Sequence, residues 1–192
     1  SEMQSLIAAT GDDLQVVAGA VKMHPRFRQA SPLQVDSLVI GVANGLFAVD
    51  PANPGEALWH VPDRECSATP AAANGSAFVS NHHEIVAHDL GATGEVLWRV
   101  PHEASRLHFG GEQLSKTGAA EPRGSVSAPV VIGDTVIVCD TGGRVRGLDV
   151  TTGDEHWRIT LPEPILTAPI VSGNAMYVAG YFGTIHALTW TT

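Results

Sequence analysis

The feature that most constrains this chain is a fourfold internal repeat. Its units recur about every 40 residues, and self-similarity at a fixed period indicates a repeat architecture rather than an arbitrary globular fold. Each unit runs from a proline to an Asp or Thr that lies 18 to 20 residues later, and in three units a tryptophan follows after another eight or nine. The four prolines are Pro32, Pro70, Pro129 and Pro169, and only the step between the second and third is longer than the others.

Each unit reads as four short strands. A pair of turn-forming residues follows the proline strand in every unit, as at Asn74-Gly75 and Gly133-Asp134, and such pairs close tight hairpins. Runs rich in β-branched residues, such as Thr135 to Cys139, come next, and no convincing run shows a helical period. Four meandering strands about every 40 residues predict a β-propeller blade. We therefore expect an all-β chain with one β-propeller domain over residues 1–192, built of about four four-stranded antiparallel blades.

Three residue types recur together at the end of each complete unit. A glycine stands four residues before each tryptophan, and an Asp precedes that glycine. The Asp can accept hydrogen bonds from the backbone of the glycine turn, and a large flat Trp can seal the gap to the next blade. We therefore interpret Trp59, Trp98 and Trp157 as structurally equivalent scaffold residues at blade-to-blade seams, and not as a substrate-binding set.

The same strings resemble a known family, the quinoprotein-type (PQQ-like) β-propellers with their tryptophan-docking repeat. The resemblance covers about residues 30 to 190 and implies a ring of seven or eight blades, of which this chain would supply about four. The strings are Ala48-Val49-Asp50 with Gly55 to Trp59, Ala87-His88-Asp89 with Gly94 to Trp98, and Gly147-Leu148-Asp149 with Gly153 to Trp157.

The ends of the chain leave the closure of the ring open. Residues 1–28 can be a degenerate blade or a closing strand, and the fourth unit has no Trp strand. Because an unpaired third strand exposes a sticky edge, we predict that a strand between Leu6 and Val21 pairs with Thr184–Leu188, within one chain or across a two-fold pair. Three interpretations remain: a closed four-bladed ring, two chains that form a ring of eight, or a piece of a longer propeller.

The candidate functional face carries the blade-to-blade links together with the turns between second and third strands. Loops that vary in length are the best pointers to function, and residues 101–126 form a link about 20 residues longer than its peers. We expect this link to be an excursion without a regular blade strand. The candidate ligand or partner residues are His82, His83, Glu84, His102, Glu103, Arg106, His108, Asp140, Arg144 and Tyr181, with Arg64, Glu65 and Phe182 on the same face.

Metal, cofactor and catalytic sites are not expected on this face. The imidazoles and carboxylates suit zinc, but no pair has the spacing of a known metal motif, so we expect a solvated polar surface. Family members that oxidise alcohols use adjacent cysteines and a calcium site in a far longer chain, whereas Cys66 and Cys139 lie far apart in this sequence. We therefore expect no quinone cofactor. The sequence also has no G-x-S-x-G motif and no phosphate-binding loop.

Composition narrows the partners and leaves the location open. A net charge of −9 argues against nucleic acid, and no apolar run is long enough for a membrane helix. Nine arginines against two lysines, with abundant Ala, Gly and Val, suggest a GC-rich bacterial source. The sequence shows no signal-peptide pattern, and the two cysteines do not decide between a cytoplasmic and an extracytoplasmic compartment.

These observations favour a non-catalytic recognition, assembly or sensor domain that binds a protein or a small ligand, with a homodimer as one option. The resemblance points the same way, since similar domains occur as sensor ends of bacterial receptor kinases and as outer-membrane assembly lipoproteins. The alternative is an enzyme, a hydrolase or lyase with a His-rich site on the same face, which would need a convergent pocket of acid, base and metal.

Overall fold

The structure is a computed structural model that describes residues 6–10, 13–17, 30–42, 45–53, 55–63, 66, 68–81, 83–91, 93–103 and 127–190. Over these residues every regular element is a β-strand. No helix in this part of the chain is long and apolar enough to cross a membrane.

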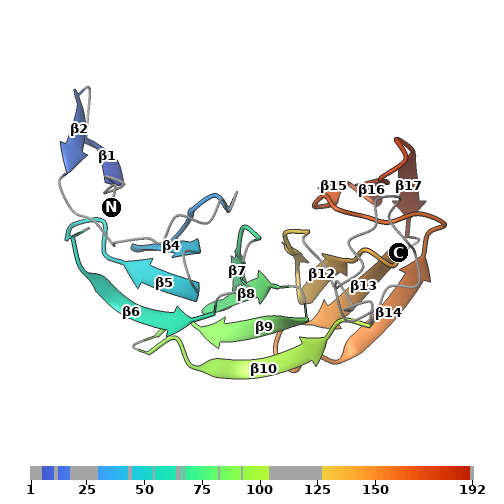
Figure 1. The fold of residues 1–192 in the computed structure, drawn as a ribbon, viewed down its shortest axis with the longest axis horizontal. Helices are drawn as coiled ribbons and strands as arrows, with labels where there is room; N and C mark the ends of the chain where they lie inside the picture. The colour runs from blue at the N-terminus through green and yellow to red at the C-terminus, as the bar shows by residue number, and fades with distance from the viewer. Residues whose placement is uncertain are drawn as a thin grey trace, which may run out of the picture.

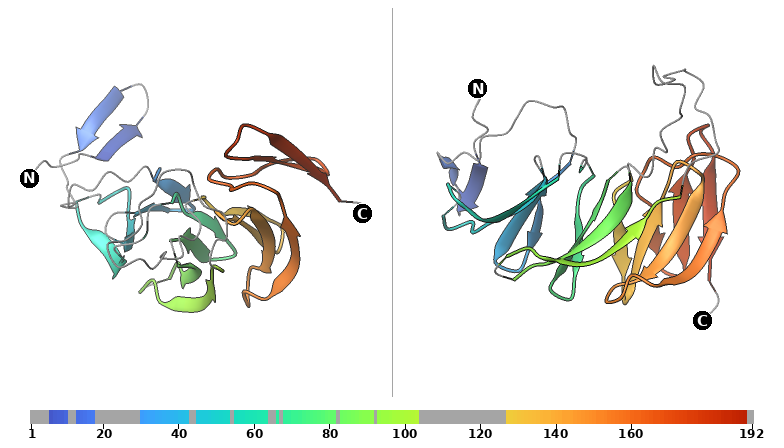
Figure 2. Two further views of the ribbon diagram at one scale, coloured as in Figure 1. Left: turned by 45° about the vertical axis from the view of Figure 1, so that its right-hand side comes forward. Right: turned by 60° about the horizontal axis from the view of Figure 1, so that its bottom comes forward.

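The strands form consecutive antiparallel sheets that follow one another around an open arc (Figures 1 and 2). Three sheets have four strands and a fourth has three, each in plain meander order, so all four repeat units fold as predicted up to the third strand. The first blade is β3 (Leu33–Val35), β4 (Leu38–Val42), β5 (Gly45–Val49) and β6 (Ala57–Pro62); the second is β7 (Ala71–Ala73), β8 (Ser76–Ser80), β9 (Glu84–Asp89) and β10 (Val96–Pro101). The third is β11 (Val130–Ile132), β12 (Thr135–Cys139), β13 (Arg144–Asp149) and β14 (Glu155–Thr160); the fourth is β15 (Ile170–Ser172), β16 (Ala175–Ala179) and β17 (Ile185–Thr189).

The first hairpin of each blade turns at the residues that the repeat predicted. Asp36 and Asn74 have positive φ angles of 50° and 51°, and Gly133 and Gly173 take 58° and 59° at the corresponding turns. Asn, Asp and Gly tolerate this left-handed conformation better than other residues. The local sequence therefore sets the strand register at the start of every blade.

The core consists of three layers, each between neighbouring blades. One cluster joins blades one and two through residues such as Ile40 and Val79, and a second joins blades two and three around Phe78 and Leu148. A third joins blades three and four around Val145 and Met176. Because a single blade cannot bury both of its faces, each blade depends on its neighbours for stability.

Tryptophans close the outer part of the seams. Trp59 and Trp98 are 8% and 9% exposed, and each packs on the docking glycine of the next blade. A Cβ added to Gly94 would lie 2.6 Å from Cε3 of Trp59, and one added to Gly153 would lie 2.9 Å from Trp98. The indole N–H of Trp98 also donates to the carbonyl of Val150 at 3.0 Å. Trp59 and Trp98 thus each lie at a seam between two blades, while Trp157 is partly buried against the third cluster.

The repeated Asp fixes the turn that carries the docking glycine, as predicted. Asp50 accepts a hydrogen bond from the N–H of Ala52 at 2.8 Å, and Asp149 accepts from Thr151 and Thr152, both at 2.8 Å. The bonds from the Thr152 and Thr151 N–H groups lower the pKa of Asp149. A shift in pairing register just before each tryptophan turns its indole toward the seam, a bulge that the spacing did not reveal.

The N-terminal strands do not close the ring within this chain. β1 (Leu6–Thr10) and β2 (Asp13–Val17) pair with each other and form a sheet of their own at the opposite end of the arc from β17 (Figure 1). The predicted pairing of an N-terminal strand with Thr184–Leu188 inside one chain is therefore wrong: β2 pairs with β1, and among the described residues β17 pairs with β16 alone. Pairing between two chains stays a prediction. The long link begins after Pro101, the last residue of β10, and residues 104–126 lie outside the described part.

Candidate binding face

The candidate face is formed by the turns between the second and third strands and by the links that leave each fourth strand. Backbone hydrogen bonds hold these segments together: His102 N–H donates to the carbonyl of His83 at 2.7 Å, and Leu161 N–H donates to Gly143 at 2.8 Å. Tyr181 N–H donates to Pro164 at 2.8 Å, which ties a link to the turn of the following blade. Links and turns therefore share one face, as the strand order predicted.

In blades two and three, the turn on this face is closed by a side-chain oxygen at its first position. The Oδ1 atom of Asn81 accepts from the N–H groups of His83 and Glu84 at 2.7 and 2.8 Å. Asp140 plays the same part in the third blade, where Oδ1 accepts from Gly142 and Arg144 at 2.8 and 3.1 Å. Asp140 is 1% exposed, so it serves the turn rather than an external ligand.

The fourth blade closes its turn with a residue borrowed from the preceding link. The first turn position is Gly180, and a Cβ there would collide with the carboxyl group of Glu163. Glu163 accepts from the N–H of Phe182 at 2.7 Å and lies 2.7 Å from Nε2 of His186. The contact with His186, followed by that with Phe182, lowers the pKa of this carboxyl.

Glu163 belongs to a set of acidic residues that bridge the blades. In the first link, Asp63 accepts from the amide of Asn81 at 3.0 Å. In the second link, Glu103 accepts from Arg144 at 2.9 Å. Each of the three acids lies in the link that follows a Trp strand and binds the next blade near the turn between its second and third strands. Their distance from the Trp varies between four and six residues. Glu103 was among the candidate residues, whereas Asp63 and Glu163 were not predicted, because the distance from the Trp drifts between the repeats.

Glu103 and Arg144 belong to a charged cluster across the second seam. Arg158 pairs with both Glu103 and Glu155, and Arg144 Nε lies 2.7 Å from Oδ2 of Asp140. The hydrogen bond from Arg158 holds the pKa of Glu103 and that of Glu155 below the usual range. Because each of these charges has an opposite partner inside the cluster, the cluster ties the blades together and offers little free charge to a ligand.

Ser80 and His102 are in hydrogen-bond contact, but the direction of the hydrogen bond does not suit nucleophilic catalysis. Nε2 of His102 lies 3.0 Å from Oγ of the fully buried Ser80. Arg146, 3% exposed, donates to Nδ1 of His102 at 2.9 Å. An arginine has no acceptor, so neutral His102 keeps its proton on Nε2 and donates it to Ser80. A general base for Ser80 would need the opposite arrangement, with a carboxylate at Nδ1.

The other candidate residues are distributed as follows. Glu84 pairs with Arg99 at 2.5 Å, and His83 contributes its backbone to the turn. No group of three His, Cys, Asp or Glu suited to a metal ion occurs among the residues that the structure describes. Cys66 and Cys139 are both buried; Cys139 is the last residue of β12, and Cys66 lies in the link between β6 and β7. Three candidates, His82, Arg106 and His108, lie outside the described residues, as do Arg64 and Glu65.

Two aromatic residues stand out on this face because they project into solvent. Tyr181 is 52% exposed and Phe182 is 73% exposed. Their rings meet edge to face with centroids 5.5 Å apart. The hydrogen bonds from the Tyr181 N–H to Pro164 and from the Phe182 N–H to Glu163 fix the backbone beneath them. The turn thus presents a pre-ordered apolar pair, the type of anchor that protein interfaces favour.

Comparisons with known proteins agree with this architecture. A family model described as outer membrane protein assembly factor BamB matches residues 81–192. No curated protein matches the chain significantly. Among solved structures, BamB from Moraxella catarrhalis is similar at 19% identity with a TM-score of 0.65, covering 96% of this chain and 58% of that one. This chain thus spans little more than half of that relative.

Two further structures share the fold. Quinohemoprotein alcohol dehydrogenase from Comamonas testosteroni is 18% identical with a TM-score of 0.62, and the match covers 81% of this chain and 29% of that enzyme. The computationally designed Ika4 protein is 15% identical with a TM-score of 0.60, and the match covers 89% of this chain and 98% of that one. At these identities the similarity establishes the fold alone.

Proposed function

Because the chain belongs to the PQQ-like β-propeller repeat family described as outer membrane protein assembly factor BamB, we propose that it is a non-catalytic binding domain for a protein partner. The observation that carries the proposal is the Tyr181–Phe182 pair, two exposed aromatic rings on a turn fixed by backbone hydrogen bonds. Interfaces draw much of their affinity from a few such residues. Since the turn is already ordered, a partner would lose little affinity to its immobilisation.

The candidate polar residues of this face support recognition rather than chemistry. Glu84, Glu103, Asp140 and Arg144 are engaged in turns and ion pairs, so they shape the face instead of activating a substrate. His102 is held as a hydrogen-bond donor toward Ser80, which argues against the hydrolase alternative for that pair. Glu103 and Arg158 pair with each other across the second seam, so their charges serve the scaffold.

The test compares two double variants of the full chain. Tyr181→Ser with Phe182→Ser removes the aromatic pair, whereas Leu58→Ser with Leu97→Ser removes two apolar side chains, 56% and 47% exposed, from the outer strands. Proteins captured from a bacterial lysate are quantified by mass spectrometry, and each candidate is then purified and titrated. We expect one protein to bind the wild type and the Leu variant alike, and the aromatic variant at least ten-fold more weakly.

Two results would contradict the proposal. A partner that binds both double variants equally would remove the aromatic pair from the interface. Thermal stabilisation of the wild type by one class of aromatic or sugar metabolite, lost in the Tyr181→Ser, Phe182→Ser variant, would instead show a small-ligand sensor.

A further inference from the structure

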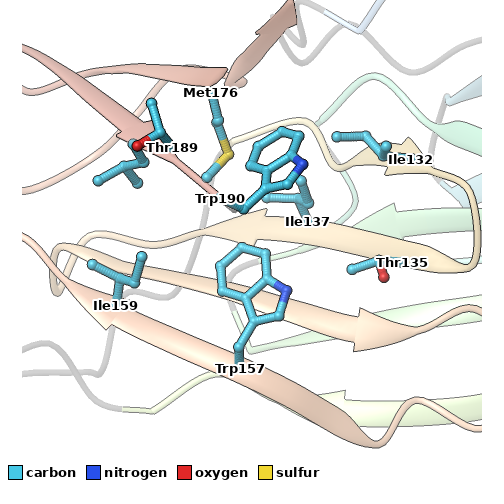
Figure 3. A pocket seen from close by; sticks show the side chains of 9 residues that line it. Ile132, Thr135, Ile137, Trp157, Ile159, Met176, Thr189 and Trp190 are labelled. Atoms are coloured by element: carbon cyan, nitrogen blue, oxygen red, sulfur yellow. The ribbon is translucent and has the colours of Figure 1, made fainter. Parts of the chain in front are cut away.

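The second and third seams differ in the side chains that fill them. Figure 3 shows the third seam, where Trp157, Ile137 and Met176 are among the mainly apolar side chains around a cavity of about 400 Å³. The second seam also has an apolar layer, around Phe78 and Leu148, but next to the candidate face it continues into polar and charged side chains. A change of protonation therefore acts on the second seam and not on the apolar part of the third.

His102 lies in the polar part of the second seam and contacts both blades. Its Nε2 atom lies 3.0 Å from Oγ of Ser80, on β8 of the second blade. Its Nδ1 atom accepts a hydrogen bond of 2.9 Å from Arg146, on β13 of the third blade. Arg146 also donates to the carbonyl of Pro101, the residue before His102, at 3.3 Å. The imidazole is thus part of the contact between the two blades, and both of its nitrogens are engaged.

This arrangement suits the neutral imidazole alone. A guanidinium has donors and no acceptor, so Nδ1 of His102 has to present a lone pair to Arg146. An imidazolium carries a proton on both nitrogens, so protonation replaces the hydrogen bond with two facing N–H groups and two positive charges. Ser80 and Arg146 are 0% and 3% exposed, so water screens this repulsion poorly.

The charges around His102 are already balanced among the residues that the structure describes. Four arginines meet four carboxylates there, so a proton on the imidazole adds a positive charge without a partner. Burial lowers the pKa of Arg146, but a guanidinium stays protonated near neutral pH. The titratable and charged groups on the surrounding elements are Arg144 and Arg146 of β13, Glu155 and Arg158 of β14, Asp140 after β12, Glu84 of β9 with Arg99 of β10, Glu103 in the link and His83 in the turn before β9.

We propose that His102 is a pH-sensitive switch in the second seam: protonation drives its imidazole out from between Ser80 and Arg146 and loosens the contact between blades two and three next to the candidate face. The side chain is half-buried, so it can reach water without the unfolding of a strand. The backbone N–H of His102, which donates to the carbonyl of His83 at 2.7 Å, lies where the seam opens. Its exchange with solvent therefore reports the opening.

The size of the effect follows from the linkage between protonation and opening. A solvated histidine titrates near pH 6.5, so at pH 5.0 protonation favours the open seam by about 30-fold if the closed seam accepts no proton. At pH 7.5 the histidine is almost entirely neutral, and this preference for the open seam nearly disappears. Glu103 and Glu155 stay ionised over this interval, because their hydrogen bonds with Arg158 lower their pKa values. The response between pH 7.5 and pH 5.0 therefore belongs to imidazoles.

The test measures hydrogen exchange of the full chain by mass spectrometry at pH 7.5 and pH 5.0, corrected for the pH dependence of chemical exchange. In the wild type, protection of the peptide that spans the end of β10 and His102 should fall by roughly 10- to 30-fold. His102→Gln keeps an acceptor for Arg146 and a donor for Ser80 but takes up no proton, so its protection should change by less than about three-fold. The matched control is His156→Gln, because His156 lies 3.4 Å from Asp149 and no arginine donates to it among the described contacts. This control should respond to pH as the wild type does.

Two results would overturn the proposal: equal protection of the wild type at both pH values, or a full response in His102→Gln, since another group would then be its cause. Arg146→Gln tests the repulsion separately, because its amide still donates to Nδ1 of His102 but carries no charge. Its response should be at least about three-fold smaller than that of the wild type, and an undiminished response would show that the charge of Arg146 is not the cause. If Arg146→Gln does not fold, the comparison of the wild type with His102→Gln decides the question by itself.

Discussion

Docking of each tryptophan on a glycine of the next blade can be tested by adding one methyl group. Gly94→Ala places a Cβ 2.6 Å from Cε3 and 2.9 Å from Cζ3 of Trp59, and the backbone there has a φ of +65°. Gly75→Ala is the matched control, because its φ is +75° and nothing lies within 4 Å of the added Cβ. Both substitutions strain the backbone to a similar degree, so the difference between them isolates the contact with Trp59.

The expected magnitudes follow from these two contributions. An alanine in the left-handed region costs about 1–2 kcal/mol, part of which is offset by the stiffer unfolded chain. We therefore expect Gly75→Ala to lower the free energy of unfolding by about 1 kcal/mol. Overpacking against a side chain held between two blades adds about 1–3 kcal/mol, which brings Gly94→Ala to about 2–4 kcal/mol.

Urea unfolding followed by circular dichroism gives the free energy of unfolding of both variants. If the slope of this free energy against urea concentration is unchanged, the substitution has changed stability alone. Trp59→Phe then removes the part of the indole that the new methyl group meets. In that background the excess penalty of Gly94→Ala should shrink by more than about 1 kcal/mol, a coupling typical of residues in contact. If Gly94→Ala and Gly75→Ala cost the same, or if the penalty persists in the Trp59→Phe background, the docking argument is refuted.

Four further predictions follow from other parts of the structure. Trp98→Ala should cost about 3–5 kcal/mol in urea unfolding, as for a buried aromatic residue, and Trp157→Ala should cost less because Trp157 is only partly buried; equal costs would contradict this. Glu163 has a lowered pKa in the folded state, so its contribution to stability is present above the unfolded-state pKa and is lost as the pH falls through the folded-state pKa. Unfolding measured between pH 7 and pH 3 should therefore show a smaller loss of stability on acidification for Glu163→Gln than for the wild type. Parallel pH dependences of the two proteins would refute this role. Neutral His102 should carry its proton on Nε2, which nitrogen NMR can read directly, and Arg146→Met should allow the other tautomer to appear. Removing about 20 residues from the link between Glu103 and Ser127 should leave the melting temperature within a few degrees, since loop closure depends weakly on length, and loss of folding would make the link part of the core.

The sequence predicted the blades well because their determinants are local. Asp149, Gly153 and Trp157 keep a nearly fixed spacing, and each acts within a few residues or on the adjoining turn. The fourth strand of each complete blade and the buried positions of Trp59 and Trp98 followed from this spacing alone. The pairing of β2 with β1 instead of Thr184–Leu188 did not, because the repeat spacing does not determine which strand an N-terminal strand will meet.

The candidate site was predicted less completely because its interactions join residues far apart in the chain. Asp140 and Arg144 were selected as candidate ligand or partner residues, yet Asp140 caps a turn and Arg144 pairs with Glu103 across a seam. The path from Ser80 through His102 to Arg146 involves three strands or links, and no local motif marks it. Of the acids in the links, Asp63 and Glu163 could have been found only by allowing their distance from the Trp to vary.

The carboxylate that Glu163 lends to the turn at Gly180 bears on the order in which the blades can fold. Blades two and three carry their own caps, Asn81 and Asp140, and can form these turns before their neighbours are in place. The turn of the fourth blade depends on a group that arrives with the chain leaving the third. In a linear array of repeats, the fourth blade is therefore less stable by itself and depends more on its interface with the third blade. The amides of the fourth blade should therefore become protected against hydrogen exchange only after those of the third blade.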